Sequence, residues 1–212
     1  MERTHQGATW HPHPGSGKPG EPDDLYTSPP PWDIGRPQPA FLSLARAGII
    51  RGRVLDAGCG TGEHTLMAAG LGLDATGVDL AAGALRVAEQ KARERGLTAR
   101  FLRRDARRLA DLGESFDTVL DCGLFHIFGD DDRAAYAGSL RSVLQPGGRY
   151  FLLCASDTQP PDGWGRVHRV SQEEIITTFA GGWRADSIEP ATIDITTSPG
   201  GIPAWLATLT RT

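Results

Sequence analysis

Four aspartates each follow a short apolar stretch, and a run of glycines comes directly after the first of them. Asp56 precedes Ala57-Gly58-Cys59-Gly60-Thr61-Gly62, and Asp79, Asp105 and Asp121 follow later apolar stretches. Glycine lets a backbone turn tightly and approach a ligand closely. Ionised carboxylates accept hydrogen bonds from hydroxyls, amines and cationic groups. These residues predict a binding site for a small polar ligand.

The residues around the glycines restrict the class of ligand. A dinucleotide-binding turn has the pattern Gly-x-Gly-x-x-Gly, which holds at Gly58 and Gly60 but ends on Glu63. A phosphate-binding loop ends on Gly-Lys-Ser/Thr, whereas this one ends on Gly62-Glu63-His64. We expect the Glu63 carboxylate to repel a pyrophosphate. The pattern therefore favours a ligand without phosphate. If that ligand carries a cationic group, we expect Asp56 to lie near it.

The later aspartates suit a nucleoside. We expect Asp79 to accept hydrogen bonds from two sugar hydroxyls. We expect Asp105 to accept one from the exocyclic amine of adenine, while the backbone N–H of Ala106 donates to a ring nitrogen. Asp121 ends a further apolar stretch. Because open α/β sheets bind ligands at the carboxyl ends of their strands, all these side chains are expected at one site.

His126 is the best candidate for acid–base chemistry. It lies in Cys122-Gly123-Leu124-Phe125-His126-Ile127-Phe128, just past the stretch that ends at Asp121. Histidine titrates near neutral pH, which suits a general base that removes a proton from an acceptor. The alternative is a histidine that only packs and hydrogen-bonds locally, and both interpretations stay open.

Other side chains are weaker candidates. Asp33, Asp157 and His168 are lesser alternatives for the base, and surface positions are the simpler interpretation. Cys59 and Cys122 have no basic partner in sequence, so we expect them to act through their backbone rather than as nucleophilic thiolates. Aromatic residues are expected to line an apolar pocket, and the candidates are Phe125, Phe128, Trp164 and Trp183, of which Trp183 fits the core better.

Strand and helix patterns alternate along the chain, which indicates an α/β fold with a mostly parallel sheet and helices on both faces. Prolines around Trp32 exclude a helix there and predict a rigid arm. Gly96 predicts a helix end, and Ser171 with Glu174 predicts a capping box. The expected strands are 53–56, 74–79, 99–102, 116–120, 149–154, near 183–195 and 205–209, and the expected helices are 39–49, 63–71, 81–95, 131–144 and 171–179.

Length and composition predict one domain. The 212 residues fit a single domain over residues 25–212, and residues 1–24, rich in Pro, Gly and His, are expected to be a disordered tail. The net charge of −4 disfavours nucleic-acid binding. The three cysteines form no CxxC pair, so we expect no metal site and a reducing, cytoplasmic compartment. Neither a signal peptide nor a membrane span is expected, and the chain is expected to be a monomer or homodimer.

The motifs together resemble a known family. Asp56-Ala57-Gly58-Cys59-Gly60-Thr61-Gly62, Gly77-Val78-Asp79, Asp105-Ala106 and Leu144-Gln145-Pro146-Gly147-Gly148 resemble the motif series of class I S-adenosylmethionine (SAM)-dependent methyltransferases. The resemblance implies a Rossmann-like sheet of seven strands, one of them antiparallel near the C-terminus. It also implies SAM as cofactor. The cofactor-binding residues it implies are Trp32, Asp56, Gly58, Cys59, Gly60, Asp79, Leu80, Asp105, Ala106 and Asp121.

Two further stretches resemble a narrower group. Trp32-Asp33-Ile34-Gly35-Arg36-Pro37-Gln38-Pro39 and Cys154-Ala155-Ser156-Asp157 are similar to stretches of small bacterial thiopurine, thiol and halide methyltransferases, a group that includes enzymes acting on heterocyclic toxins. This resemblance implies a small aromatic or heterocyclic acceptor, methylated on oxygen, nitrogen or sulfur. It also implies that Trp32 lies near the methionine end of SAM.

Two alternatives are kept. An RNA or DNA methyltransferase would often carry an Asn/Asp-Pro-Pro-aromatic run where this chain has Asp121-Cys122-Gly123-Leu124. A SAM-binding sensor without catalysis would keep the glycine run and the aspartates but transfer no methyl group. A NAD-dependent oxidoreductase is disfavoured by Glu63.

Overall fold

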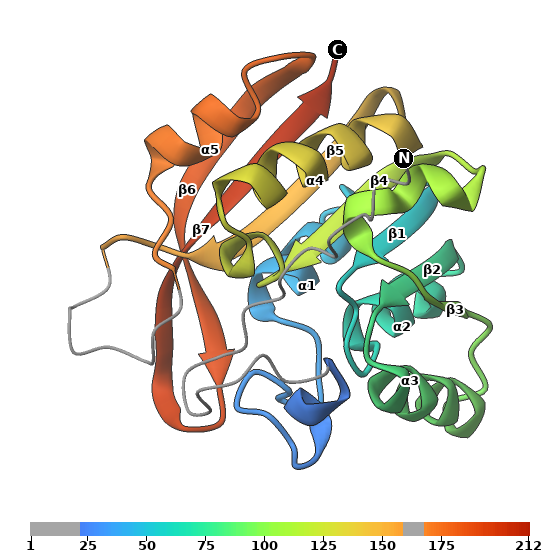
Figure 1. Ribbon diagram of the computed structural model, residues 1–212. Coiled ribbons are helices and arrows are strands. Elements are labelled where there is room, and N and C mark those ends of the chain that lie inside the picture. Colours follow the sequence, from blue (N-terminus) through green and yellow to red (C-terminus); the bar gives the residue numbers. More distant parts are fainter. Residues whose placement is uncertain (1–21, 159–167) are drawn as a thin grey trace, which may run out of the picture.

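The computed structural model describes residues 22–158 and 168–212. A seven-stranded sheet runs through the molecule in the order β3-β2-β1-β4-β5-β7-β6 (Figure 1). The pairs from β3 to β5 are parallel, and β7 is antiparallel to both of its neighbours. This confirms the expected Rossmann-like sheet with one antiparallel strand. The strands are β1 (Arg53–Ala57), β2 (Asp74–Asp79), β3 (Arg100–Arg103), β4 (Phe116–Cys122), β5 (Leu144–Ala155), β6 (Trp183–Ile195) and β7 (Ser198–Arg211).

The helices follow the expected alternation. Gly96 lies two residues beyond the end of α3 with a φ of 62°, as its role at the helix end requires. Ser171 and Glu174 form the expected capping box on α5. The helices are η1 (Pro22–Tyr26), α1 (Pro39–Arg46), α2 (Glu63–Gly70), α3 (Ala82–Glu94), η2 (Ala106–Leu112), η3 (Phe125–Ile127), α4 (Asp130–Val143) and α5 (Gln172–Thr178), where η marks a 3₁₀ helix.

Three segments differ from the expectation. Pro22–Tyr26 form η1, which begins within the last three residues of the expected tail, and Asp23 accepts a hydrogen bond from the Gly83 backbone at the start of α3. Residues 1–21 lie outside the described part of the chain. β5 begins at Leu144 rather than at Arg149, because a shift in register between Phe116 and Thr118 of β4 accommodates the extra residues. β7 is much longer than its expected range of 205–209.

Two apolar clusters cover the two faces of the sheet. One packs α4, α5 and η2 onto the sheet and contains Phe125, Tyr136 and Trp183. The other packs α1 and α2 onto the opposite face and contains Phe41 and Ile193. Because both faces are covered, the central strands are apolar without alternation, as in Val119–Leu120 and Phe151–Leu153. No helix among residues 22–158 and 168–212 is long and apolar enough to cross a membrane.

The N-terminal segment and the last hairpin meet beside the sheet. Figure 1 shows the blue segment after η1 lying between the β6–β7 hairpin and α3. Thr196 donates its backbone N–H to the Pro31 carbonyl at 2.8 Å. The buried Gln38 side chain donates to the Asp194 carbonyl and accepts from the Asp194 backbone N–H. These bonds place the segment that carries Trp32 over the carboxyl ends of the strands.

Candidate active site

A cavity opens at the carboxyl ends of the parallel strands. The register aligns Ala57 of β1 with Val78 of β2 and with Asp121 of β4, so these strands end at one edge. The cavity is lined by the residues that follow these strands, by the N-terminal segment and by the β6–β7 hairpin. Of the residues expected at the cofactor, those that line it are Trp32, Gly58, Cys59, Gly60, Asp79, Leu80, Asp105 and Ala106.

The glycine turn has a shape that side chains would prevent. Gly58, Gly60 and Gly62 have φ values of 72°, 52° and 86°, in the left-handed region that favours glycine. A Cβ on Gly60 would lie 2.7 Å from the Tyr26 hydroxyl, and one on Gly58 would lie 3.0 Å from Leu124. The turn therefore presents bare backbone to the cavity, which is the property expected from the sequence.

Asp79 ties the end of β2 to this turn. Its Oδ2 accepts the Gly60 backbone N–H at 2.8 Å, and its Oδ1 accepts the Ala81 N–H at 2.8 Å. Burial raises the pKa of this carboxyl, an effect opposed by the backbone donors. Because a carboxylate has about four acceptor positions, Asp79 can also accept a hydroxyl in the cavity.

Asp105 follows β3, the outermost parallel strand, and a cation lies beside it. The Arg107 guanidinium donates to both of its oxygens, from Nη2 at 2.6 Å and from Nε at 3.0 Å and 3.2 Å. Burial raises the pKa of this carboxyl, but the hydrogen bonds and charge of Arg107 outweigh it and leave the pKa lowered. Arg107 also donates to Asp132 on α4 at 2.8 Å, and the guanidinium lies over the Phe128 ring. Asp105 is thus an ionised acceptor held rigidly beside Ala106.

Asp56 and Asp121 lie behind the cavity lining formed by the described residues. Asp56 is 1% exposed, and its Oδ2 accepts the backbone N–H and the hydroxyl of Thr65 at 2.9 Å and 2.7 Å. Asp56 Oδ1 has no hydrogen-bond partner among the described residues, and burial raises the pKa of Asp56 to about 7. The structure therefore does not bring these two carboxylates into the cavity as the sequence suggested.

Asp121 instead organises the turn that carries His126. It is fully buried, and its Oδ2 accepts the hydroxyls of Tyr136 and Tyr150 at 2.9 Å and 2.8 Å. Its Oδ1 accepts the backbone N–H groups of Leu124 at 2.9 Å and of Phe125 at 3.4 Å. Burial raises the pKa of this carboxyl to about 6, although four donors oppose that shift. Through the bonds to its Oδ1, Asp121 fixes the backbone at the start of η3.

His126 lines the cavity and is 5% exposed. Its Nδ1 accepts the backbone N–H of Ala155, at the end of β5, at 3.0 Å. A Cβ on Gly123 would lie 3.3 Å from Cε1 and 3.4 Å from Nε2 of this ring. The Nε2 edge therefore lies beside Gly123, another residue of the lining. The sequence placed His126 at the cavity but gave no sign of the Ala155 contact.

The N-terminal segment is fastened to the glycine turn by polar contacts. The Thr61 hydroxyl donates to Asp33 at 2.8 Å, and Lys91 on α3 donates to the Thr61 hydroxyl at 2.8 Å. Tyr26 meets Trp32 edge to face at 6.5 Å between ring centroids. Asp33 therefore attaches the N-terminal segment to the glycine turn, instead of being a surface residue without a structural role. The sequence alone gave no signal for Tyr26, which reaches Gly60 from just beyond the expected tail of residues 1–24.

Glu63 does not act as its position suggested. It accepts hydrogen bonds from Arg95 at 2.8 Å and forms an ion pair with Lys91 at 2.9 Å. Burial raises the pKa of Glu63, but these cations outweigh it, so the pKa is lowered and the carboxylate stays charged but balanced. Glu63 thus pairs with Arg95 and Lys91 of α3 and its C-terminal end, a contact that the local sequence did not indicate, and the expected repulsion of a pyrophosphate stays a prediction.

The far end of the cavity is apolar. Ile34 comes from the N-terminal segment, and Ile193 and Ile202 come from facing positions of the β6–β7 hairpin. Phe128, from the loop after η3, lines the cavity beside Arg107 instead. His64 of α2 also lines it, and its Nε2 accepts the Gln38 backbone N–H at 3.1 Å. Burial lowers the pKa of His64 to about 4, so the ring is neutral.

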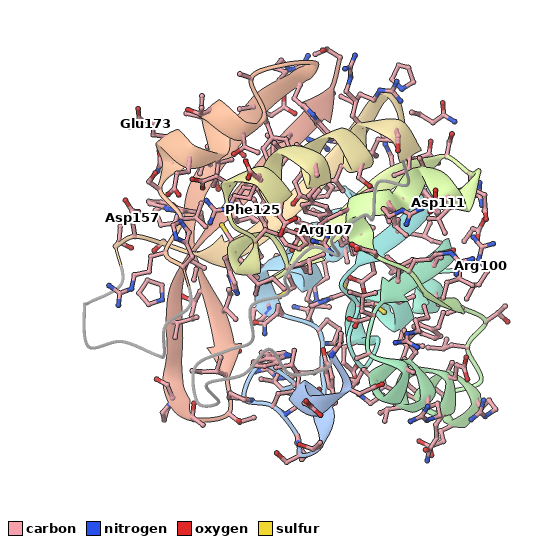
Figure 2. All side chains as sticks on the ribbon, in the orientation of Figure 1. Arg100, Arg107, Asp111, Phe125, Asp157 and Glu173 are labelled. Carbon is pink, nitrogen blue, oxygen red and sulfur yellow. The ribbon has the colours of Figure 1, made fainter. Side chains whose placement is uncertain are left out.

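Other candidates lie elsewhere. Phe125 is fully buried in the core beside α4, where Figure 2 labels it, and Trp183 is 8% exposed in the same core. Asp157, labelled at the periphery in Figure 2, accepts from Trp205, and His168 pairs with Glu174 on the surface. Trp164 lies outside the described residues. Cys59 and Cys122 line the cavity, but burial raises the pKa of both thiols well above the ordinary value, which agrees with the expectation that neither is a thiolate.

The edge fits SAM. SAM carries a cationic amino-acid end and an adenosine, and the cavity offers bare backbone at Gly58 and Gly60 beside the carboxylates of Asp79 and Asp105. Asp56 Oδ1, which has no hydrogen-bond partner in the part of the chain that the structure describes, lies behind the same turn. Among residues 22–158 and 168–212, no group of three or more His, Cys, Asp or Glu side chains is placed to hold a metal ion.

Comparisons with known proteins agree with this geometry. A family model described as a methyltransferase domain matches residues 54–148. The 2-heptyl-1-hydroxyquinolin-4(1H)-one methyltransferase of Mycobacteroides abscessus is 35% identical over 173 residues, which cover 81% of this chain and 76% of the relative. The demethylmenaquinone methyltransferase of Thermus thermophilus is 33% identical over 73% of this chain and 72% of the relative.

Solved structures show the same fold. One from work on the conversion of a disulfide bond into a thioacetal group during echinomycin biosynthesis is 38% identical with a TM-score of 0.80, and the match covers 89% of each chain. The magnesium protoporphyrin IX methyltransferase of Synechocystis with bound SAM has a TM-score of 0.64 at 23% identity, covering 82% of this chain and 76% of that chain. This chain belongs to the class I SAM-dependent methyltransferases and uses SAM as its cofactor.

Proposed function

We propose that this enzyme methylates an oxygen, nitrogen or sulfur atom of a small aromatic or heterocyclic molecule. The observation that carries the proposal is one cavity whose lining includes the cofactor residues Asp79 and Ala106, the side chain of His126, and the apolar side chains of Ile193 and Ile202. A planar apolar acceptor matches that end, since apolar contact and a few polar groups are what small-molecule sites offer.

The names of relatives support the same class of acceptor. The relative that is 35% identical is named for a hydroxyquinolinone, and another, 33% identical, is named for demethylmenaquinone. The structure that is 38% identical comes from work on a disulfide in echinomycin biosynthesis. These names include a hydroxyquinolinone, a demethylmenaquinone and a disulfide, so they favour a small-molecule acceptor without selecting the atom that is methylated.

The residues at the cofactor end have distinct proposed roles. When bound, SAM supplies a methyl group on a sulfonium, and transfer needs a nucleophile held in line with the departing sulfur. Asp79 accepts the ribose hydroxyls, Asp105 and the backbone of Ala106 bind adenine, and the glycine turn with Trp32 holds the methionine end. Leu80 packs against the base, and Cys59 takes part through its backbone. Asp56 and Asp121 support this site from behind rather than touching the cofactor.

The proposal is tested by incubating the pure protein with methyl-labelled SAM and an acceptor panel. The panel holds N-hydroxyquinolinones, phenols, thiophenols and quinols, with total RNA and unrelated protein as controls. We expect label in at least one ring compound, identified by mass spectrometry as a gain of one methyl group. Label in RNA alone would contradict the proposal, and tight SAM binding with no transfer to any acceptor would indicate a sensor.

A further inference from the structure

His64 is a polar side chain among the apolar residues at one end of the cavity. It is the second residue of α2, it lines the cavity, and it is partly exposed. Its ring meets Phe41 edge to face at 4.9 Å between ring centroids, and Phe41 packs in the same apolar cluster as Ile193 and Ile202. His64 therefore lies beside the side chains of the proposed acceptor end.

One hydrogen bond fixes the tautomer of this ring. Nε2 of His64 accepts the backbone N–H of Gln38 at 3.1 Å, so this nitrogen carries no proton. Burial lowers the pKa of His64 to about 4, so the ring is neutral at neutral pH and its single proton is on Nδ1. His64 is thus an acceptor at Nε2 and a donor at Nδ1.

The residue that holds the His64 ring is itself held firmly. Gln38 is 2% exposed and precedes the first residue of α1. Its side-chain amide donates to the Asp194 carbonyl at 3.0 Å and accepts the Asp194 backbone N–H at 2.8 Å. The start of α1 therefore joins α2 to the β6–β7 hairpin, and it fixes the orientation of the His64 ring relative to that hairpin.

The Nδ1–H of His64 is available to a ligand. Within residues 22–158 and 168–212, no atom accepts this proton, and Nδ1 is not one of the buried side-chain atoms that lack a partner. Nδ1 is therefore open to the cavity that the ring lines. A donor among apolar side chains favours a ligand that supplies an acceptor atom, because the N–H stays unpaired beside a ligand without one.

A second side chain at this end of the cavity also presents donors. Arg36 of the N-terminal segment lines the cavity, and its guanidinium donates to the Asp194 carboxylate at 2.7 Å. A guanidinium has several N–H donors, so this bond leaves others for a ligand. The apolar side chains nearby favour the body of a ring, and they are Ile34, Ile193 and Ile202.

We propose that His64 is a specificity residue that donates Nδ1–H to a carbonyl oxygen on the ring of the acceptor. The enzyme therefore prefers ring compounds that carry such a carbonyl in addition to the atom that is methylated. A carbonyl oxygen accepts the hydrogen bond without bringing a net charge among the isoleucines, whereas a hydroxyl would add a donor that these side chains cannot satisfy. The inference rests on the proposed function and deepens it, because it names the substrate class of the same site.

The test compares two ligands that differ in one oxygen. Chroman-4-one carries a ring carbonyl, and chroman is the same ring system without it. The affinity of each for the protein saturated with S-adenosylhomocysteine (SAH) is measured by ligand-observed NMR titration. We expect the wild type to bind chroman-4-one at least about fivefold more tightly than chroman. A smaller preference, or tighter binding of chroman, would overturn the proposal.

Variants assign this preference to the His64 ring. His64→Phe keeps a ring without a donor, so we expect it to lose the preference for chroman-4-one, whereas His64→Gln keeps an amide donor and part of the preference. A change in packing alone weakens both ligands alike and leaves the ratio of their affinities unchanged. Ile202→Ala, which shortens an apolar side chain of the same end, is the matched control and should keep the wild-type ratio. An unchanged ratio in His64→Phe would overturn the proposal.

Nitrogen-15 NMR of labelled histidine in the wild type tests the donor without relying on the folding of a variant. We expect a proton on Nδ1 of His64 and none on Nε2, with the Nδ1 signal moving more on addition of chroman-4-one than of chroman. A proton on Nε2, or equal shifts with both ligands, would contradict the donor role.

A cofactor arm separates the acceptor from the carboxylate of SAM, which also offers oxygen lone pairs. SAH and 5′-methylthioadenosine, which lacks the amino-acid end, are titrated into the wild type and His64→Phe. We expect the substitution to change both affinities by the same factor. A loss for SAH alone would assign the Nδ1–H to the cofactor and overturn the proposal. No binding of either ring compound, with no methyl transfer to any acceptor, would instead defeat the proposed function on which this inference rests.

Discussion

Asp79 links three parts of the site through one carboxylate. It accepts the Gly60 N–H and the Ala81 N–H, and it lines the cavity between the glycine turn and β2. Its charge is therefore both a support for the turn and the proposed acceptor for the ribose. The two roles can be measured separately. Loss of the bond to the turn lowers the free energy of unfolding, and loss of the ribose contact lowers SAM affinity.

We predict that Asp79→Ala weakens SAM binding by about 10- to 100-fold, because a hydrogen bond to a charged group is worth about 1.5–3 kcal/mol. Calorimetric titration with SAM measures the change. Asp74→Ala, at the opposite and exposed end of the same strand, is the matched control and should keep wild-type affinity. Wild-type affinity in Asp79→Ala would remove Asp79 from the ribose site.

Asp56 should make stability depend on pH. Burial raises its pKa to about 7 in the folded chain. Because an unfolded aspartate titrates near about 3.9, the stability linked to this proton is fully present below about pH 4 and is lost as pH rises through about 7. The asparagine side chain of the Asp56→Asn variant cannot ionise, so this variant does not lose that stability as the pH rises.

We therefore predict that the free energy of unfolding of Asp56→Asn rises relative to wild type between about pH 5 and about pH 8. Urea unfolding of both proteins at each pH gives the difference. A difference that stays constant over this range would show that Asp56 is ionised throughout in the folded chain.

At the scale of elements, the N-terminal segment is attached to the glycine turn through one carboxylate. It is fastened at Asp33 by the Thr61 hydroxyl, and Lys91 approaches the same carboxylate at 4.0 Å. We predict that Asp33→Ala speeds hydrogen exchange in residues 30–38 and weakens SAM binding several-fold, while peptides from β4 are unchanged. Mass spectrometry of exchanged peptides measures it, with the exposed Glu89→Ala on α3 as control. Equal exchange in all three proteins would mean that the segment is held by its other contacts.

The alternation of strands and helices was predictable because each regular element repeats an apolar pattern over several residues. The 3₁₀ helices were not, since η1, η2 and η3 are too short or too irregular for a periodic signal. The glycine turn and Asp79 were also predictable, because they follow a strand directly in sequence. The hydrogen bond from Ala155 to His126 and the pairing of Glu63 with Arg95 were not, since about thirty residues separate each pair.

At the scale of the molecule, the two ends of the described chain close one cavity. The segment around Pro31 bonds to Thr196 of the hairpin, and Gln38 bonds to Asp194. Ile34 and Ile202 reach the cavity from these two parts. The sheet thus supplies the cofactor end, while elements outside the parallel strands shape the proposed acceptor end.

We predict that Ile34→Ala raises KM for the acceptor by about tenfold and leaves SAM affinity within about twofold, because the lost apolar contact is worth about 1–2 kcal/mol. Steady-state kinetics and SAM titration separate the two effects. Ile176→Ala is the matched control, since Ile176 is 53% exposed on α5. An equal loss of SAM affinity would place Ile34 at the cofactor instead.

A crystal structure with SAH tests the central claim most directly. We predict the adenosyl group in the cavity, its ribose hydroxyls on the Asp79 carboxylate and its amino-acid end against the backbone of Gly58 and Gly60. The same density would also show whether the Asp105 carboxylate reaches the adenine amine. SAH bound at another surface, with nothing between Asp79 and the glycine turn, would contradict this description of the site.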